Sequence, residues 1–272
     1  RGLIWECWSR SAGAGIDAEK GAAPLAPDPE MSPEMLRHRN RRLLAAAQDS
    51  IGRIGKLLNG TRAILILTDH TGVIFEAVGD RETLEDARDI NLEIGGVWDE
   101  RAIGTNGIGT ALSAGAPVFV HAAEHFCSGI KAWTCAGAPI HDPLDNSVLG
   151  VVDLSGPPDI FQRHNTALVT AAGCEIEASL AERQIEDRLR LLEAFHDTVP
   201  VRGSEDAYVI LDQYGRVVYR RNTANSAVFD ELKDEVTFGQ RLLELSDEMT
   251  DADIVAAAPE KLRPRGAVPL SH

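Results

Sequence analysis

The chain of 272 residues is long enough for one large domain or two ordinary ones. Apolar residues make up 44% of it and charged residues 25%, which is the composition of a globular protein and not of a disordered one. The net charge of −15 argues against direct binding to nucleic acid, because most of the surface would repel phosphate.

Signals for membrane insertion or secretion are not recognisable in the sequence. No apolar run approaches the roughly 20 residues that span a bilayer, and the opening RGLIWECWSR lacks the continuous apolar segment of a signal peptide. The chain does not start with Met, which suggests that its natural N-terminus extends further. The cysteines are too few and too scattered for a disulfide framework; they are Cys7, Cys127, Cys135 and Cys174. We therefore expect a cytoplasmic protein that does not bind membranes.

Residues 1–31 are predicted to form an irregular arm, because much of this segment is rich in Gly, Ala and Pro. Ser32 followed by Pro33 is a typical helix start, with Ser as the N-cap and Pro at the first helical position. An apolar stripe with helical spacing follows, which predicts a helix over 32–58. The stripe can pack into a core or against the same helix of a second copy, since the spacing suits both.

The middle of the chain alternates strand-length apolar runs with turn residues. Strands are predicted at residues 62–68, 73–78, 117–121, 136–140 and 147–154. The Gly-rich run GTNGIGT predicts a turn that leads into a helix. Helices before, between and after these strands define the fold class as α+β with an antiparallel sheet, and we assign residues 59–180 to this domain.

A long helix is predicted over 165–198, and a second strand–turn–strand pattern follows at 207–221. The helix has no sustained heptad repeat, so it indicates a coiled coil only weakly. Its second half is highly charged and would be stable mainly when packed on a partner. We interpret residues 181–200 as a linker helix and residues 201–272 as a second, partial module with an irregular tail.

Aromatic and polar side chains are concentrated between residues 98 and 135. Only 5% of the chain is aromatic, yet two tryptophans and a phenylalanine fall in this stretch beside acidic, histidine and thiol side chains. A pocket for a small molecule is typically apolar with a few polar groups, whereas core packing is the ordinary role of aromatic residues. The candidate ligand-binding residues of this cluster are Trp98, Glu100, Glu124, His125, Phe126, Trp133 and Cys135.

The run GTNGIGT, from Gly104 to Thr110, also raises the question of anion binding. Gly-rich turns at helix N-termini bind phosphate, but this run has no lysine and its glycine spacing fits neither nucleotide-binding fingerprint. A turn with Thr105 or Asn106 as the helix cap is the better interpretation, and both are kept as candidate ligand-binding residues.

Two alternatives use the thiols and imidazoles of the same region. Cysteine and histidine suit Zn or Fe, although the paired C-x2-C of structural zinc sites is absent; the candidates are His121, His125, Cys127 and Cys135, with His141 nearby in the sequence. Cys135 with a histidine and Asp142 could alternatively form a nucleophilic thiol site. We favour neither alternative, and expect no enzyme activity.

Three blocks carry a resemblance to a known family. The run GGVWDERAIGTNGIGTALSAGAPVFVHAAEHF, then WTCAGAPIHDP and LGVVDLSGP, resembles the GAF-type sensory domain of the acetoin-catabolism activator family. These are bacterial enhancer-binding regulators that work with sigma-54 RNA polymerase. The opening IWECWSRSAGAGID resembles the lead-in of the family, and AYVILDQYGRVVYRRNTAN resembles the start of a PAS-like module.

The resemblance implies a sensory region and not a complete regulator. It implies a small organic effector, mostly uncharged, such as a ketone, short alcohol or aromatic compound, which binds the GAF domain and shifts the flanking helices of a homodimer. The chain has neither G-x-x-x-x-G-K-[ST] nor a basic helix pair at its C-terminus. Partners such as sigma-54 RNA polymerase and DNA would therefore be reached only through an ATPase and a DNA-binding domain that this chain lacks. Some GAF proteins are thiol-dependent methionine sulfoxide reductases, which is the enzymatic alternative within the fold.

Overall fold

The computed structural model describes residues 2–26, 32–198, 208–212 and 216–221. The chain divides into two compact units, Arg1–Leu180 and Ala181–His272, and each is considered by itself. The first unit contains all of the candidate ligand-binding residues named above.

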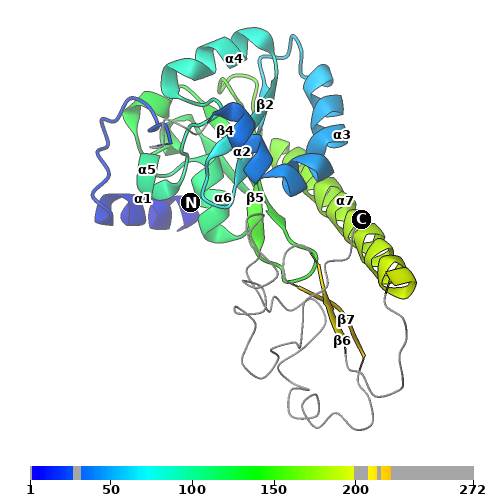
Figure 1. Cartoon of the computed structure of the whole chain (residues 1–272). Helices are drawn as coiled ribbons and strands as arrows, with labels where there is room; N and C mark the ends of the chain where they lie inside the picture. The colour runs from blue at the N-terminus through cyan, green and yellow to red at the C-terminus, as the bar shows by residue number, and fades with distance from the viewer. Residues whose placement is uncertain (1, 27–31, 199–207, 213–215, 222–272) are drawn as a thin grey trace. The chain divides into compact units, whose positions relative to one another are not determined.

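An antiparallel sheet in the order β2-β1-β5-β4-β3 forms the centre of the first unit (Figure 1). Its strands are β1 (Ile64–Asp69), β2 (Ile74–Gly79), β3 (Val118–His121), β4 (Thr134–His141) and β5 (Val148–Gly156). Every neighbouring pair is antiparallel. The predicted α+β class is confirmed, and each strand lies within two residues of its predicted bounds.

Side chains alternate between the two faces of the sheet, and each face has its own apolar core. Leu65 and Leu67 point to a core shared with helices α2, α3 and α7, and we call this side the α3 face. Ile64 and Ile66 point to a core shared with helices α5 and α6, and we call this side the α6 face. Figure 1 shows α3 and α7 on one side of the sheet and α1 and α5 on the other.

The α3 face is covered by α2 (Pro33–Arg39), α3 (Arg41–Leu57) and the first turns of α7 (Asn165–Thr198). Ser32 caps α2 as predicted, because its hydroxyl accepts from the Met35 N–H at 3.2 Å. The single helix predicted over 32–58 is wrong in one respect. It breaks at Asn40, whose φ of −102° and ψ of 19° are not helical, and whose side-chain amide donates to the Leu36 carbonyl at 2.9 Å. Asparagine competes in this way with the helix for backbone groups.

The α6 face carries shorter elements, which are α4 (Arg81–Ala87), α5 (Glu100–Ile103), α6 (Gly107–Ala114) and the 3-10 turns η1 (Arg88–Ile90), η2 (Ala122–Glu124) and η3 (Ser128–Ile130). Helix α4 was not predicted. It starts at Asp80, whose carboxylate accepts from the Thr83 N–H at 3.1 Å in a standard N-cap.

The N-terminal segment begins with a helix, α1 (Gly2–Gly13), where an irregular arm was predicted. A helix of this length is marginal in isolation, so its stability depends on contacts with distant parts of the chain. Trp8 packs against the α6-face core. The segment that follows α1, residues 14–26, is called the strap and is also held in place. The Ser128 N–H donates to the Ala18 carbonyl at 2.7 Å, and Leu25 forms a β-bridge with Gly96.

The second unit contains the later turns of α7 and a hairpin of β6 (Tyr208–Leu211) and β7 (Val217–Arg221). The predicted strand–turn–strand pattern is therefore present. Its assignment to a PAS-like module stays a prediction, and residues 222–272, including the predicted irregular tail, lie outside the described residues. Within the described part of the chain, no helix is both long and apolar enough to cross a bilayer.

Candidate functional site

The predicted ligand-binding residues lie on the α6 face or in the segments that cover it; they are Trp98, Glu100, Thr105, Asn106, Glu124, His125, Phe126, Trp133 and Cys135. Trp98 and Phe126 belong to the α6-face core, with 1% and 8% of their surface exposed, and Trp133 packs against it. The Trp98 indole donates to the Asn91 carbonyl at 3.0 Å. Because these rings are held in the core, the polar side chains around them decide what this face can recognise.

Asn106 holds the junction of α5 and α6. Its carboxamide oxygen accepts from the N–H groups of Ile108 and Gly109, both at 2.9 Å, and so caps α6 as the sequence predicted. Its amide group donates to the carbonyls of Trp98 at 3.0 Å and Gly104 at 2.8 Å. With these four bonds Asn106 fixes the loop, which is a structural role.

Glu100 and Thr105 are engaged by helix α1. The Glu100 carboxylate is 8% exposed and accepts a two-pronged contact from the Arg10 guanidinium at 3.0 to 3.2 Å. It also accepts from the Thr110 hydroxyl at 2.7 Å. The Thr105 hydroxyl lies 3.3 Å from that of Ser11. Helix α1 is thus bonded directly onto the predicted site, a role that the sequence did not indicate.

Trp8 of α1 closes the site over η2 and the residues after it. Its indole N–H donates to the Glu124 carbonyl at 2.7 Å. Its ring meets Phe126 edge-on with centroids 5.5 Å apart, and the Lys131 ammonium lies 5.5 Å from the ring centroid. Edge-to-face and cation–π contacts each add to the area that the indole buries. Sequence reasoning missed Trp8, although the Trp5–Trp8 pair was a visible signal.

His125 lies directly after η2 and is fully buried. Its backbone N–H donates to the Ala122 carbonyl at 3.1 Å, and ring Nδ1 is 3.0 Å from the same oxygen. Burial lowers the pKa of His125 to about 4, so the imidazole is neutral at neutral pH. Its Nε2 atom is buried and has no hydrogen-bond partner among the described residues.

A second buried polar cluster lies on strands β4 and β5. The Ser155 hydroxyl donates to Asp153 Oδ2 at 2.5 Å and is 3.1 Å from the Cys135 sulfur. Burial raises the pKa of Asp153 to about 7, against the opposing effect of the Ser155 hydrogen bond. Asp153 Oδ1 has no partner within the part of the chain described. Gly107 of α6 packs on this cluster, where an added Cβ would meet Asp153 Oδ1 at 2.4 Å.

Asp153 lies in the middle of strand β5, where its carboxylate pairs locally with Ser155. Its neighbour in the cluster, Cys135, does not fit the thiol-enzyme alternative. Burial raises the pKa of Cys135, and the charge of Asp153 adds to the effect, so the reactive thiolate is disfavoured. Asp142, the acid of the proposed thiol site, is instead paired with Arg42 at 2.7 Å.

The metal alternative is not supported by the arrangement of its ligands. Across the residues that the structure describes, no three His, Cys, Asp or Glu side chains are grouped to hold an ion. His121 Nδ1 is 3.0 Å from the Thr134 hydroxyl, and the Cys127 thiol donates to the Asp17 carbonyl at 3.3 Å. His125 and Cys135 have the separate environments described above. These four candidates therefore serve different local contacts.

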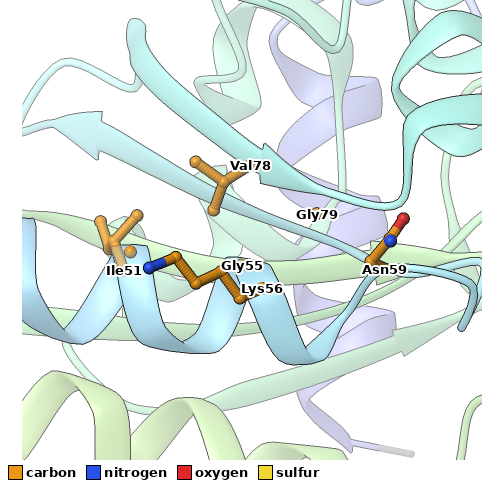
Figure 2. A pocket seen from close by; sticks show the side chains of 7 residues that line it. Ile51, Gly55, Lys56, Asn59, Val78 and Gly79 are labelled. Atoms are coloured by element: carbon orange, nitrogen blue, oxygen red, sulfur yellow. The ribbon is translucent and has the colours of Figure 1, made fainter.

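A groove of about 420 Å³ lies elsewhere, on the α3 face between helix α3 and the edge strand β2 (Figure 2). It is lined by Ile51, Gly52, Gly55, Lys56, Asn59, Val78 and Gly79, and none of the predicted ligand-binding residues is among them. Gly55 permits the close approach of α3 to β2, because a Cβ there would meet Val78 at 2.8 Å. Sequence reasoning gave this groove no role.

The fold is an α+β domain of the GAF-like class, with an antiparallel sheet flanked by helices. Among solved structures, it is similar to the DhaR N-terminal region of Escherichia coli in the DhaR(N)–DhaL complex, with a TM-score of 0.66 over 86% of this chain and 87% of that chain. The identity is 17%, so this likeness shows the fold alone.

The chain belongs to the family described as MimR, N-terminal domain, whose model matches residues 3–178. It is 32% identical to the acetoin dehydrogenase operon transcriptional activator AcoR of Bacillus subtilis, over 72% of this chain and 32% of AcoR. It is 30% identical to the propane 2-monooxygenase operon transcriptional activator MimR of Mycolicibacterium goodii, over 71% and 32% of the two chains. The chain thus spans about a third of the length of these relatives. The resemblance to the acetoin-activator family is confirmed.

Proposed function

We propose that this chain is the effector-sensing region of a bacterial transcriptional activator. A small, mostly uncharged organic molecule would bind on the α6 face and thereby control a sigma-54-dependent ATPase in the full-length cytoplasmic protein. The relatives named above are activators of operons for acetoin dehydrogenase and propane 2-monooxygenase, which supports an effector of a few carbon atoms. The ATPase and DNA contacts belong to parts of the regulator beyond this region.

The observation that carries the proposal is a pair of buried polar atoms on the α6 face, His125 Nε2 and Asp153 Oδ1. Neither has a partner among the described residues. An unsatisfied buried polar group costs about 1–3 kcal/mol, and such groups are retained where function requires them. A polar ligand would supply the missing hydrogen bond and so bind with a gain in stability. Asp153 joins the proposed ligand-binding residues on this ground.

The α6 face is connected to helix α7 through strand β4. His141 ends β4, and both its backbone N–H and its Nδ1 contact the Glu177 carboxylate of α7, at 2.7 and 3.0 Å. Glu175, on the same helix, is bonded to Ser50 and Arg53 of α3. A change in the packing of β4 would therefore bias the position of α7 against α3. A ligand can drive such a change only if it binds the two states differently.

We further propose that α7 pairs with its counterpart in a homodimer. Small or apolar residues at helical spacing are exposed on its first half, at Ala167, Leu168, Ala171, Cys174 and Ala178. Leu168 is 52% exposed, and in the second half of the helix Ile185 and Leu189 are 60% and 54% exposed. Such a stripe suits close helix–helix contact, and symmetric pairing is the commonest oligomeric arrangement.

Ligand-induced stabilisation tests the sensor proposal. The purified protein is melted in the presence of matched alcohols, ketones, acids and aromatic compounds, and native mass spectrometry searches for molecules carried through purification. A ligand at 100 times its dissociation constant should raise the free energy of unfolding by about 2.7 kcal/mol. Failure of the whole panel to shift the melting temperature, together with no bound mass, would overturn the proposal.

The dimer proposal has a separate test. Leu168→Glu should shift the protein to monomer in analytical ultracentrifugation, whereas Leu144→Glu, at a residue 38% exposed in the β4–β5 turn, should not. Cys174 is exposed while the other three cysteines are buried, so a short bismaleimide should link two copies through Cys174. A wild-type protein that is monomeric at all concentrations would contradict the pairing.

A further inference from the structure

We propose that His125 sets the chemical class of the effector, and that it selects a molecule with a neutral hydrogen-bond donor, such as a hydroxyl group, over a carbonyl compound or a carboxylate. This inference rests on the proposed sensor function, because it specifies the chemistry of the same site. It follows from which ring nitrogen of His125 carries the proton.

The hydrogen-bond partner of Nδ1 fixes the tautomer. Nδ1 lies 3.0 Å from the Ala122 carbonyl oxygen, and a carbonyl oxygen can only accept a hydrogen bond. Nδ1 must therefore carry the proton. In the neutral imidazole the other nitrogen, Nε2, is then an acceptor with a lone pair.

The ring cannot easily turn to find another partner. The Ala122 carbonyl accepts both from the His125 backbone N–H at 3.1 Å and from Nδ1. Ala122 itself has a φ of +44°, a conformation that is costly for any residue with a Cβ. The Glu124 carboxylate holds the same turn by accepting from the His121 N–H at 2.8 Å. The strained turn at Ala122 thus holds the His125 imidazole in one orientation through two hydrogen bonds to the same carbonyl.

The surroundings of His125 oppose its protonation and exclude water. The residue is fully buried, and the nearby His121 and Lys131 disfavour a second positive charge. Trp8 and Phe126 cover the turn that carries His125. In such an environment the acceptor Nε2 forms a strong hydrogen bond with a ligand donor, because water does not compete for it.

These features discriminate between ligand classes. A hydroxyl group can donate to Nε2 while its apolar body packs against the aromatic cover. A ketone of the same skeleton presents only an acceptor, so two acceptors would face each other with no proton between them. A carboxylate adds the cost of burying an unpaired charge. A hydrogen bond is worth about 0.5–1.5 kcal/mol net, and losing it with the acceptor left buried costs more, so the alcohol should bind at least about tenfold more tightly than its ketone.

The test measures binding of matched alcohol, ketone and carboxylic acid sets on linear, branched and aromatic skeletons, such as 2-butanol, 2-butanone and butyrate, by calorimetry at pH 7.5. In the wild-type protein the alcohol of a binding skeleton should be preferred by about tenfold or more. His125→Phe keeps a flat ring but removes the acceptor, so the preference should disappear. His125→Gln places an amide oxygen near the position of Nε2 and should retain part of it. His70→Phe is the matched control, because His70 is exposed in the turn between β1 and β2, and it should keep the full preference.

Each outcome separates the two proposals. If ketones or acids bind as tightly as alcohols, or if the preference survives in His125→Phe, the role of His125 is refuted while the sensor proposal stands. If no compound binds and native mass spectrometry finds no carried ligand, the sensor proposal itself fails. If His125→Phe does not fold, the alcohol-to-ketone ratios in the wild-type, His125→Gln and His70→Phe proteins decide the question.

Discussion

Replacing Asp153 with Asn should change the free energy of unfolding of the first unit in a pH-dependent way. Relative to the wild type, the variant should be more favoured at neutral pH than at acidic pH. Asp153 is fully buried in strand β5, and its carboxylate accepts a hydrogen bond from the Ser155 hydroxyl. Burial raises its pKa from 3.8 to about 7. Asn has almost the same shape and cannot ionise, so the substitution removes the cost of burying a charge and preserves the packing beside Gly107.

The sign and size of the effect follow from proton binding. Between the two pKa values the folded protein holds a proton on Asp153 that the unfolded chain has released, so stability falls as the pH rises from 3.8 to about 7 and then levels off. A tenfold change in an ionisation constant corresponds to about 1.4 kcal/mol. The complete loss is therefore on the order of 4 kcal/mol, and about 2–3 kcal/mol of it falls between pH 5 and pH 8.

Urea denaturation followed by tryptophan fluorescence at pH 5, 6, 7 and 8 measures this loss. All four tryptophans, at positions 5, 8, 98 and 133, lie in the first unit, so the signal reports on that unit alone. The difference in unfolding free energy between Asp153→Asn and the wild type should grow with pH and reach a plateau above about pH 7. Asp89→Asn, at an exposed carboxylate, serves as the control and should show no comparable growth.

The comparison with the variant is necessary because His125 acts in the opposite direction. Burial lowers the pKa of His125 from 6.5 to about 4, so the unfolded chain binds the extra proton between these values and stability rises with pH. In the wild type this gain offsets the loss from Asp153 over much of the same range. A difference between Asp153→Asn and wild type that is constant from pH 5 to pH 8 would refute the assignment of a buried, ionising Asp153.

Four further substitutions test the architecture of the α6 face. Gly104→Ala should lower the free energy of unfolding by about 1–3 kcal/mol in urea denaturation, because Gly104 has a φ of +72° and a Cβ there would meet Phe126 at 2.8 Å. Gly115→Ala, with a φ of +58° and nothing within 4 Å, should cost less, and an equal cost would contradict the packing argument. Asn106→Ala should cost about 1–2 kcal/mol in the same assay by removing the cap of α6, and a neutral result would count against that role. Glu100→Gln should weaken the docking of α1 and accelerate tryptic cleavage of the strap, and an unchanged cleavage rate would show that other contacts suffice.

Local sequence signals were enough to predict the strands of the sheet, but not the N-terminal helix that packs over the α6 face. The strands follow from apolar runs bounded by turn residues, and the helix start at Ser32 follows from the N-cap and the proline after it. Helix α1 could not be predicted in this way, because its stabilising contacts are far away in the chain. Trp8 bonds to a carbonyl 116 positions later, and Arg10 to a carboxylate 90 positions later. The break at Asn40 did have a local signal, since asparagine is a frequent helix terminator.

In the candidate site, too, some features could be predicted from the local sequence and others could not. Asp153 had a visible signal, because it is the one charged residue of the apolar run VLGVVDLSG and a charge in a buried strand requires an explanation. The difference between His121 and His125, both named as candidates from the sequence, had no such signal. His121 and His125 are the same residue type four positions apart, yet His121 is exposed beside the Thr134 hydroxyl, whereas His125 is buried and its Nε2 has no hydrogen-bond partner among the described residues. The difference arises from the turn at Ala122, whose strained backbone directs one carbonyl at both N–H groups of His125. The composition around residues 121–125 can therefore indicate a ligand-binding site. Whether that site would prefer a hydrogen-bond donor or an acceptor depends on the conformation of the backbone.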